Sequence, residues 1–288
     1  MPNKQKQVRL LTNDDVPAIE RLLRTSEYIY QRFTLNELPL LLNRYPAVGL
    51  WQDTSLYGFL LSQATKSPFA WFGGFGVSWT ESKNYVSILS TLLDQLYVQL
   101  LAEGIRSLNY SGNDANNDWL RNLLLARGFI PYQNLYSYDK FDYKVPTEGN
   151  QEVTIRPVNL AEDMSSLLAI EDACFEDFWR YDSLSFHDVA ATHPYFMVVE
   201  QAGKVIGYQF NTVDEDYGYL VRIAVHPSAA HKGIGARLMT EAIRFFAKSR
   251  VSRIMLNTQE DNYHAHQLYE WFGFIRLQNK GFVLRKNL

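Results

Sequence analysis

The feature that most constrains this fold is an internal repeat. Both halves of the 288-residue chain begin with a short strand-like stretch and an acidic turn, at 8–15 and at 155–163, and both end in a helix-like stretch closed by Gly-Phe. Four pairs of matched residues stand 145 to 149 positions apart: Arg9 and Arg156, Gly58 and Gly207, Val77 and Val225, and Gly128 and Gly273. Because four landmarks rarely share one spacing by chance, the sequence predicts two copies of one α/β unit.

The boundary between the copies is marked by a break in the apolar pattern. Residues 144–150, which include Pro146 and Gly149, interrupt the periodicity. We therefore expect a first domain over residues 1–141, a linker over 142–152 and a second domain over 153–288. About 150 residues is an ordinary length for one folded domain.

Composition excludes several classes of protein. With 47% hydrophobic and 20% charged residues, the chain is an ordinary globular sequence and not a disordered one. A net charge of −3 gives no strong field for nucleic acid. The single cysteine, Cys174, excludes an internal disulfide and a zinc site built from several cysteines. No run of about 18 apolar residues and no secretory signal are visible, so we expect a soluble, cytoplasmic protein without a membrane partner.

Periodicity in the second copy predicts alternating strands and helices. Apolar residues recur at helical spacing from Ile234 to Phe246, and they predict a long helix over 234–248. A second helix over 262–272 is closed by Gly273 just past its end. The remaining pattern predicts strands at 154–157, 195–200, 205–212, 217–225, 252–256 and 282–285, and a helix over 160–174.

The most informative stretch is the turn between the strand 217–225 and the long helix. Pro227 ends strand pairing, and Gly233 and Gly235 remove side chains where a ligand could approach the backbone. The first amides of a helix lack internal partners, and the helix dipole attracts anions to that end. The sequence therefore predicts a phosphate or diphosphate site on the backbone of residues 231–236. No third glycine completes a Rossmann fingerprint, and the order of residues does not fit a Walker A loop.

As a set, the motifs of the second copy resemble those of the GNAT superfamily of acyl-CoA-dependent N-acyltransferases. The motifs are Val225-His226-Pro227, Gly233-Ile234-Gly235-Ala236, Asn262, Ala265, Leu268-Tyr269 and Gly273-Phe274. The resemblance covers about residues 154–288. A shorter similarity, in 170–175 and Trp179, is to the branch that acetylates protein N-termini. The expected architecture is thus two tandem GNAT folds of the α/β (α+β) class, each a mixed, mostly antiparallel twisted sheet flanked by helices.

The resemblance implies a role for each matched residue. The backbone of Ile223, Ala224 and Val225 would pair with the pantetheine arm of acetyl-CoA, and the N–H of Val225 would face the thioester oxygen. Tyr269 would protonate the departing thiolate, and Asn262 would hold the cofactor near the splayed strands. The implied diphosphate loop consists of His231, Lys232, Gly233, Ile234, Gly235 and Ala236.

Some of these residues also have a purely structural explanation. Tyr269 could be a core tyrosine, Asn262 could cap its helix, and Cys174 is best explained as a small buried residue. The general base is not identified, because Asn257 and Tyr219 stand where two branches of the family carry a glutamate. A water held by Tyr219 or Glu260 is the remaining expectation. No metal site is expected.

The first copy lacks the motifs. At an offset of 148, Gly233 and Gly235 fall on Tyr85 and Ser87, and at an offset of 145 Tyr269 falls on Leu124. We therefore expect a degenerate first domain without a phosphate loop.

The resulting functional prediction is an N-acetyltransferase that moves an acetyl group from acetyl-CoA directly to a primary amine. The acceptor would be a protein N-terminus or a small-molecule amine, and the enzyme a monomer or homodimer. The alternative is a non-catalytic acyl-CoA-binding sensor or scaffold.

Overall fold

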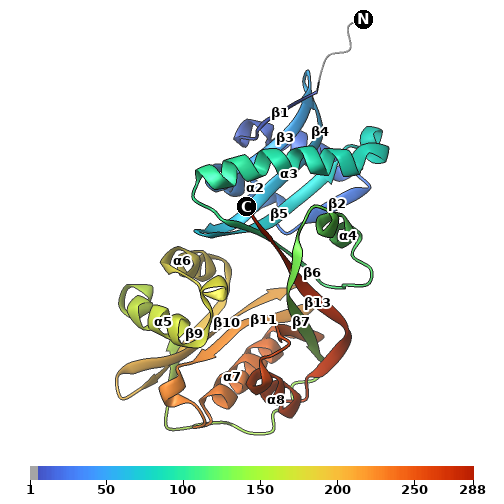
Figure 1. Cartoon of the computed structure of the whole chain (residues 1–288). Coiled ribbons are helices and arrows are strands. Elements are labelled where there is room, and N and C mark those ends of the chain that lie inside the picture. The colour runs from blue at the N-terminus through green and yellow to red at the C-terminus, as the bar shows by residue number, and fades with distance from the viewer. Residues whose placement is uncertain (1–5) are drawn as a thin grey trace, which may run out of the picture. The chain divides into compact units, whose positions relative to one another are not determined.

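The chain forms two compact units in a computed structural model that describes residues 6–288. One unit contains residues up to Gln133 together with Phe282–Leu288, and the other contains Asn134–Gly281. The order of helices and strands repeats from one half of the chain to the other, as the landmarks predicted (Figure 1). The α/β class with two similar units is confirmed.

The first half contains four helices and seven strands among the described residues. They are β1 (Gln7–Leu10), α1 (Val16–Thr25), β2 (Tyr28–Gln31), α2 (Leu38–Arg44), β3 (Ala47–Gln52), β4 (Ser55–Lys66), β5 (Phe69–Val77), α3 (Tyr85–Ala102), β6 (Ser107–Gly112), α4 (Trp119–Ala126) and β7 (Ile130–Lys140).

The second half repeats this order with one difference. Its elements are β8 (Thr154–Pro157), α5 (Leu160–Cys174), α6 (Ser183–Thr192), β9 (Tyr195–Gln201), β10 (Lys204–Asp214), β11 (Tyr217–Val225), α7 (Ile234–Ser249), β12 (Arg253–Gln259), α8 (Tyr263–Trp271) and β13 (Ile275–Asn287). Where the first half has β2, the second has a short 3-10 turn, Asp177–Trp179.

Each unit has a mixed, mostly antiparallel sheet. In the second unit β8, β9, β10 and β11 are antiparallel neighbours, β11 and β12 are parallel, and β12 is antiparallel to β7. In the first unit β1, β3, β4 and β5 are antiparallel, β5 and β6 are parallel, and β6 is antiparallel to β13.

The last parts of two strands belong to the unit of the other half. Residues 135–140 of β7 pair with residues 254–259 of β12, and residues 282–287 of β13 pair with residues 107–112 of β6. The predicted boundaries, 1–141 and 153–288, therefore need correction at both ends. The physical reason is that strands pair with strands far away in the sequence. A domain boundary predicted from local composition therefore cannot take this pairing into account.

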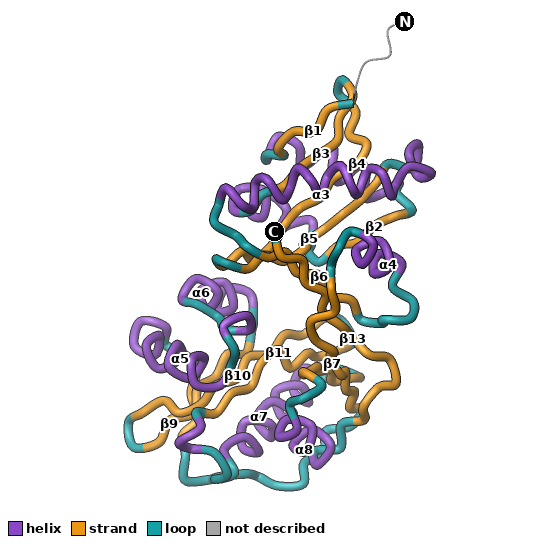
Figure 2. The backbone as a smooth tube through the Cα atoms, in the orientation of Figure 1, coloured by secondary structure: helices purple, strands orange, loops and turns teal. Residues whose placement is uncertain are grey.

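Helices cover both faces of the second unit's sheet (Figure 2). Tyr208 and Phe210 of β10 pack with α5 and α6, whereas Ile206 packs with Ile234 and Leu238 of α7. Alternation alone would place Ile206 on the same face as Tyr208 and Phe210. The register shift between Val205 and Gly207 leaves Ile206 in a β-bulge and turns it to the opposite face. Helix α7 begins at the residue that the periodicity predicted and ends at Ser249.

The first unit contains the most apolar helix of the described residues. The stretch Trp79–Ala102, which includes α3, is long and apolar enough to cross a membrane by length and composition alone. One face of α3 is packed into the core of this unit through Ile88, Leu89, Leu92, Leu93, Leu96 and Leu100. The helix is thus accounted for by core packing.

The segment 142–152 was expected to be a linker. In the structure it has no regular secondary structure, but it lies along α7 and is fixed by hydrogen bonds to that helix. It appears as the yellow-green segment that passes α7 and α8 in Figure 1. It is therefore a packed part of the second unit.

Candidate active site

The central feature of the second unit is a gap between two parallel strands. Among the described residues, β11 and β12 pair over Tyr217–Tyr219 and Arg253–Met255, and beyond this stretch each strand pairs with its other neighbour alone. The edge of β11 from Leu220 to Val225 therefore faces the gap. An extended chain-like ligand can add to such an edge through backbone hydrogen bonds.

The N–H of Val225 points into this gap. The N–H of His226 donates to the carbonyl oxygen of Ile206 on β10 at 2.8 Å. Because backbone groups alternate in direction along a strand, the N–H groups of Val225 and Ile223 point away from β10. The arrangement gives Val225 the orientation that an oxyanion donor needs, and Ala224 pairs with Tyr208 of β10 instead.

The predicted diphosphate loop leads from β11 into α7. His231 and Gly233 have positive φ values of 59° and 73°, and Gly233 is the N-cap of the helix. The first turn of α7 thus presents the amides of Ile234, Gly235 and Ala236, which have no acceptor within the helix. His231 and Lys232 are exposed beside them.

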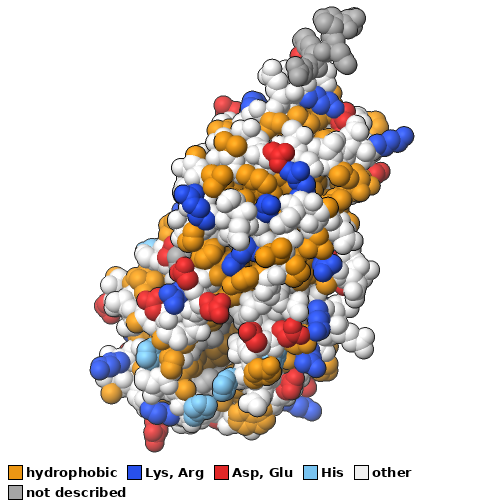
Figure 3. All heavy atoms as spheres, in the orientation of Figure 1, with side chains coloured by type: hydrophobic (Ala, Val, Ile, Leu, Met, Phe, Trp, Pro, Cys, Tyr) orange, Lys and Arg blue, Asp and Glu red, His pale blue; other side chains and the backbone are white. Residues whose placement is uncertain are grey.

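This loop lies against helix α8. A side chain built on Gly235 would meet Leu268 at 3.6 Å, and the rings of His231 and His264 lie 5.9 Å apart. Figure 3 shows histidine side chains on the surface of this part of the molecule, among interspersed acidic and basic groups. The structure therefore brings the loop and α8 together, as the resemblance requires.

Tyr269 is buried on the inner face of α8. Its side chain is 6% exposed, and its ring lies 5.7 Å from that of Tyr138. Burial, with Tyr219 and Tyr138 nearby, raises the pKa of the Tyr269 phenol well above its usual range. The phenol is therefore protonated at neutral pH, the state that a proton donor needs. Tyr219 lies at the last paired position before the strands separate.

Asn262 caps α8. Its Oδ1 accepts a hydrogen bond from the Ala265 N–H at 3.3 Å, and its Nδ2 donates to the Thr258 hydroxyl at 3.1 Å. The side chain of Asn262 therefore caps the helix and fixes the start of α8 to the end of β12, which is compatible with the predicted cofactor role.

Glu260 is poorly suited to the role of general base. Its carboxylate accepts hydrogen bonds from Lys280 Nζ at 2.8 Å, Asn134 Nδ2 at 2.7 Å and Tyr136 Oη at 2.8 Å. The hydrogen bond from Lys280, followed by those from Asn134 and Tyr136, lowers the pKa of Glu260 to about 2. A carboxylate with so low a pKa is a weak proton acceptor at neutral pH, which counts against Glu260 as the general base.

Sequence reasoning missed a buried ion pair beside the gap. Arg222 of β11 donates to both carboxylate oxygens of Glu171 at 2.8 and 2.6 Å, and Glu171 is 1% exposed. The Arg222 guanidinium also donates to the carbonyl of Trp179 at 2.6 Å and lies between the rings of Phe175 and Tyr181, 4.0 and 4.3 Å from their centres. The sequence feature that could have revealed this ion pair is the single charged residue, Arg222, within an otherwise apolar strand.

This ion pair fixes the segment 175–181 next to β11. The Tyr181 N–H donates to Glu171 at 2.6 Å, and the Cys174 thiol donates to the Val225 carbonyl at 3.2 Å. Burial, and secondarily Glu171, raises the pKa of Cys174 to about 11, so this thiol is neutral. Cys174 thus has the packing role expected of a small buried residue.

The same gap in the first unit is filled by the chain itself. β5 and β6 also pair over only three residues, Phe69–Trp71 with Ser107–Asn109. Beyond them, β2 pairs with residues 74–77 of β5, and the Tyr30 hydroxyl donates to the Ser111 carbonyl of β6 at 3.0 Å.

Within residues 6–288, no group of three or more His, Cys, Asp or Glu side chains is placed to hold a metal ion.

Comparison with known proteins assigns the family of the second copy. Residues 162–274 match the model of the acetyltransferase (GNAT) family, so the second copy contains a GNAT domain. The chain is 26% identical over 194 residues to the mycothiol acetyltransferase of Pseudarthrobacter chlorophenolicus, a match that covers 60% of this chain and 58% of that protein. It is 25% identical over 112 residues to a putative ribosomal protein bS18-alanine N-acetyltransferase of Bacillus subtilis, covering 39% and 74%.

Both units together resemble a solved tandem protein. The tandem GNAT protein from the clavulanic acid biosynthesis pathway superposes with a TM-score of 0.72 at 11% identity, covering 98% of each chain. At this identity the likeness concerns the fold alone. The fold is that of two tandem GNAT units, as the repeat and the motifs predicted.

Proposed function

We propose that the second unit transfers an acetyl group from acetyl-CoA to a primary amine. The observation that carries this proposal is the gap between β11 and β12, with the Val225 N–H directed into it and the Tyr269 phenol buried beside it. Acetyl-CoA is the donor substrate, and the loop from His231 to Ala236 would hold its diphosphate. The matched family and both curated relatives support acetyl transfer. We expect the enzyme to act in the cytoplasm.

The proposed reaction is a direct attack of the neutral amine on the thioester carbonyl. Negative charge that develops on the carbonyl oxygen would be stabilised by the Val225 N–H. As the carbon–sulfur bond breaks, the Tyr269 hydroxyl would transfer its proton to the sulfur. The phenol then recovers a proton as the new amide loses one from its nitrogen to solvent.

A site in which Glu260 is not the general base restricts which amines can react. An α-amino group with a pKa near 8 is roughly one-tenth neutral at pH 7, whereas a lysine amine near 10.4 costs roughly 4.6 kcal/mol to deprotonate at that pH. We therefore propose acceptors with low amine pKa values. A protein α-amine and a small-molecule amine both satisfy this condition, and the two relatives acetylate one of each kind by name.

The substitution Tyr269→Phe tests the reaction. It removes one hydroxyl from a packed ring, so the turnover number should fall roughly hundredfold or more while the dissociation constant of CoA stays within about twofold. Release of free thiol from acetyl-CoA should be measured against peptides, polyamines and aminoglycosides. Tight CoA binding without acetyl transfer to any acceptor in the wild type would favour the sensor alternative.

A further inference from the structure

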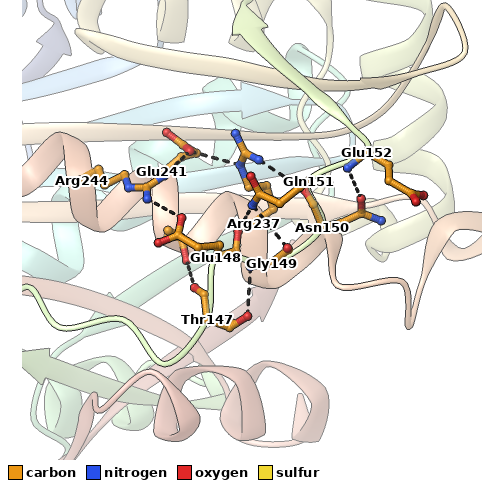
Figure 4. Close-up of polar contacts among 10 residues, drawn as sticks. Thr147, Glu148, Gly149, Asn150, Gln151, Glu152, Arg237, Glu241 and Arg244 are labelled. Carbon is orange, nitrogen blue, oxygen red and sulfur yellow. Dashed lines mark hydrogen bonds and ion pairs between the residues drawn. The ribbon is translucent and has the colours of Figure 1, made fainter.

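The segment between the two halves lies on the outer face of α7, antiparallel to it. The Thr240 hydroxyl donates to the Thr147 carbonyl at 2.8 Å, and Arg244 forms an ion pair with Glu148 (Figure 4). Further along, Arg237 donates to the Asn150 carbonyl at 3.4 Å. We call residues 147–152 the strap.

The strap ends on the predicted diphosphate loop. The Asn150 N–H donates to the Gly233 carbonyl at 3.1 Å, and its Nδ2 donates to the Lys232 carbonyl at 2.8 Å. The Asn150 Oδ1 accepts from the Glu152 N–H at 2.8 Å, which fixes the side-chain amide from its other end. One residue of the strap thus holds two successive carbonyl groups of the loop.

Close approach of the strap to α7 depends on Gly149. A Cβ atom at this residue would lie 2.2 Å from the backbone nitrogen of Arg237 and 2.5 Å from its Cα, and φ at Gly149 is +68°. Backbone atoms cannot give way as a flexible side chain can. A side chain at Gly149 would therefore lift the strap from the helix.

The loop needs such support because its backbone conformation is unfavourable. His231 has a positive φ of 59°, a conformation that costs on the order of 1 kcal/mol for a residue with a side chain. Gly233 adopts the same region two residues later. A strained loop keeps its shape only when its surroundings fix it.

We propose that Asn150 is a positioning residue that keeps the diphosphate loop in its anion-binding shape. By holding the carbonyls of Lys232 and Gly233 on the strap side, it leaves the amides of the first turn of α7 free to face the ligand. The inference rests on the proposed function, because it concerns the same cofactor loop. It assigns a ligand-binding role to a segment that composition alone marked as a linker.

The matched pair Asn150→Ala and Gln151→Ala tests this role. Both changes remove an uncharged amide from the strap, but the Gln151 amide donates only to Glu148 and Gly149 within the strap. In the full chain, Asn150→Ala should raise the dissociation constant of CoA and the KM for acetyl-CoA about tenfold, with kcat within about twofold. Gln151→Ala should leave all three within about twofold. Calorimetry with CoA and steady-state kinetics measure these quantities.

The outcomes separate this inference from the proposed function. If the wild type binds no CoA, the proposed function is wrong and the inference fails with it. If the wild type binds CoA and Asn150→Ala binds it equally well, the positioning role alone is wrong. A melting temperature lowered without a change in CoA affinity would also overturn it. Should Asn150→Ala not fold, Asn150→Ser removes the same Nδ2 donor and is judged by the same criteria.

Discussion

The gap between the parallel strands is open in one unit and filled in the other. In the second unit no strand of residues 6–288 lies beside the gap-facing edge of β11 beyond Tyr219, and in the first unit β2 occupies the corresponding edge of β5. β2 lies between α1 and α2, the place that residues 175–182 take between α5 and α6. The same part of the repeat therefore fills the gap in one copy and lies outside it in the other.

A single position accounts for much of this difference. Phe210 pairs with Arg222 just before a bulge, and Leu61 pairs with Gly74 just before the matching bulge. Gly74 therefore stands where Arg222 does. Without a side chain at this position, the first unit cannot form the ion pair that holds 175–181 in the second.

The two units also differ at the end of the gap that lies next to the start of α3 or α7. Tyr85, the counterpart of Gly233, stacks on Tyr28 of β2 with ring centres 4.1 Å apart, and the Trp119 ring packs edge-on at 5.4 Å from that of Tyr28. Aromatic side chains thus occupy the place where the second unit has the predicted diphosphate loop. One copy of this fold thus fills with its own chain the gap that the other copy leaves open.

The largest expected effect concerns the strand that the first half supplies to the second unit. A fragment of residues 151–288 lacks β7 and exposes the edge of β12, so we expect it to be insoluble or unfolded. A fragment of residues 134–281 retains β7 and should unfold cooperatively. Circular dichroism and urea unfolding of the two fragments make the comparison, and equal stability would show that the pairing of β7 with β12 is dispensable.

The next effect concerns the ion pair that distinguishes the two gaps. Arg222→Met leaves Glu171 buried without its partner and should destabilise the protein by about 3 kcal/mol, measured by urea unfolding. Adding Glu171→Gln removes the buried charge and should recover part of this loss. If the single and double variants were equally destabilised, the pair would not be the interaction that fixes 175–181.

A smaller effect should distinguish the start of α7, with its predicted diphosphate loop, from the start of α3 in the first unit. Gly235→Asp places a carboxylate in the first turn of α7, where it suits the helix dipole but repels a diphosphate, so CoA affinity should fall roughly hundredfold with the fold intact. Its counterpart Ser87→Asp in α3 should leave CoA affinity unchanged. Calorimetry should give one CoA per chain in the wild type. A stoichiometry of two, or an effect of Ser87→Asp on affinity, would contradict a filled first gap.

The smallest expected effect is on catalysis by Glu260→Gln, which should keep activity within about threefold. The variant should instead change the pH dependence of stability. Because the pKa of Glu260 is lowered to about 2 in the folded protein, its carboxylate contributes stability above its usual pKa near 4.5, and this contribution disappears as the pH falls toward 2. The melting temperatures of wild type and variant should differ at pH 7 and converge near pH 2. Loss of activity beyond a hundredfold would restore Glu260 as a candidate base.

Much of the fold could be predicted because the repeat and the helical periodicity are local or regular signals. The start of α7 at Ile234 and the end of α8 before Gly273 followed from glycines and apolar spacing. β2 could not be predicted, because its four residues show no alternation and its partner is 43 or more residues away. The exchange of β7 and β13 was missed for the same reason.

The same distinction between local and long-range signals applies to the residues of the candidate site. Residues whose role depends on their own backbone, such as Gly233 and Val225, have the conformation or direction that the motif predicts. The hydrogen-bond partners of Glu260 could not be predicted, because they come from β7 and β13, far away in sequence. Arg222 was overlooked because its meaning depends on Glu171, 51 residues earlier.

The exchange of strands has a consequence for folding on the ribosome. The sheet of the first unit needs Phe282–Asn287 beside β6, whose last residue is Gly112. At a synthesis rate of about 5–20 residues per second, the edge of β6 remains unpaired for on the order of ten seconds or more while the intervening residues are made. The amino-terminal half thus cannot complete its sheet until the carboxy-terminal half has been made, whereas the first domain of a tandem chain generally folds during synthesis.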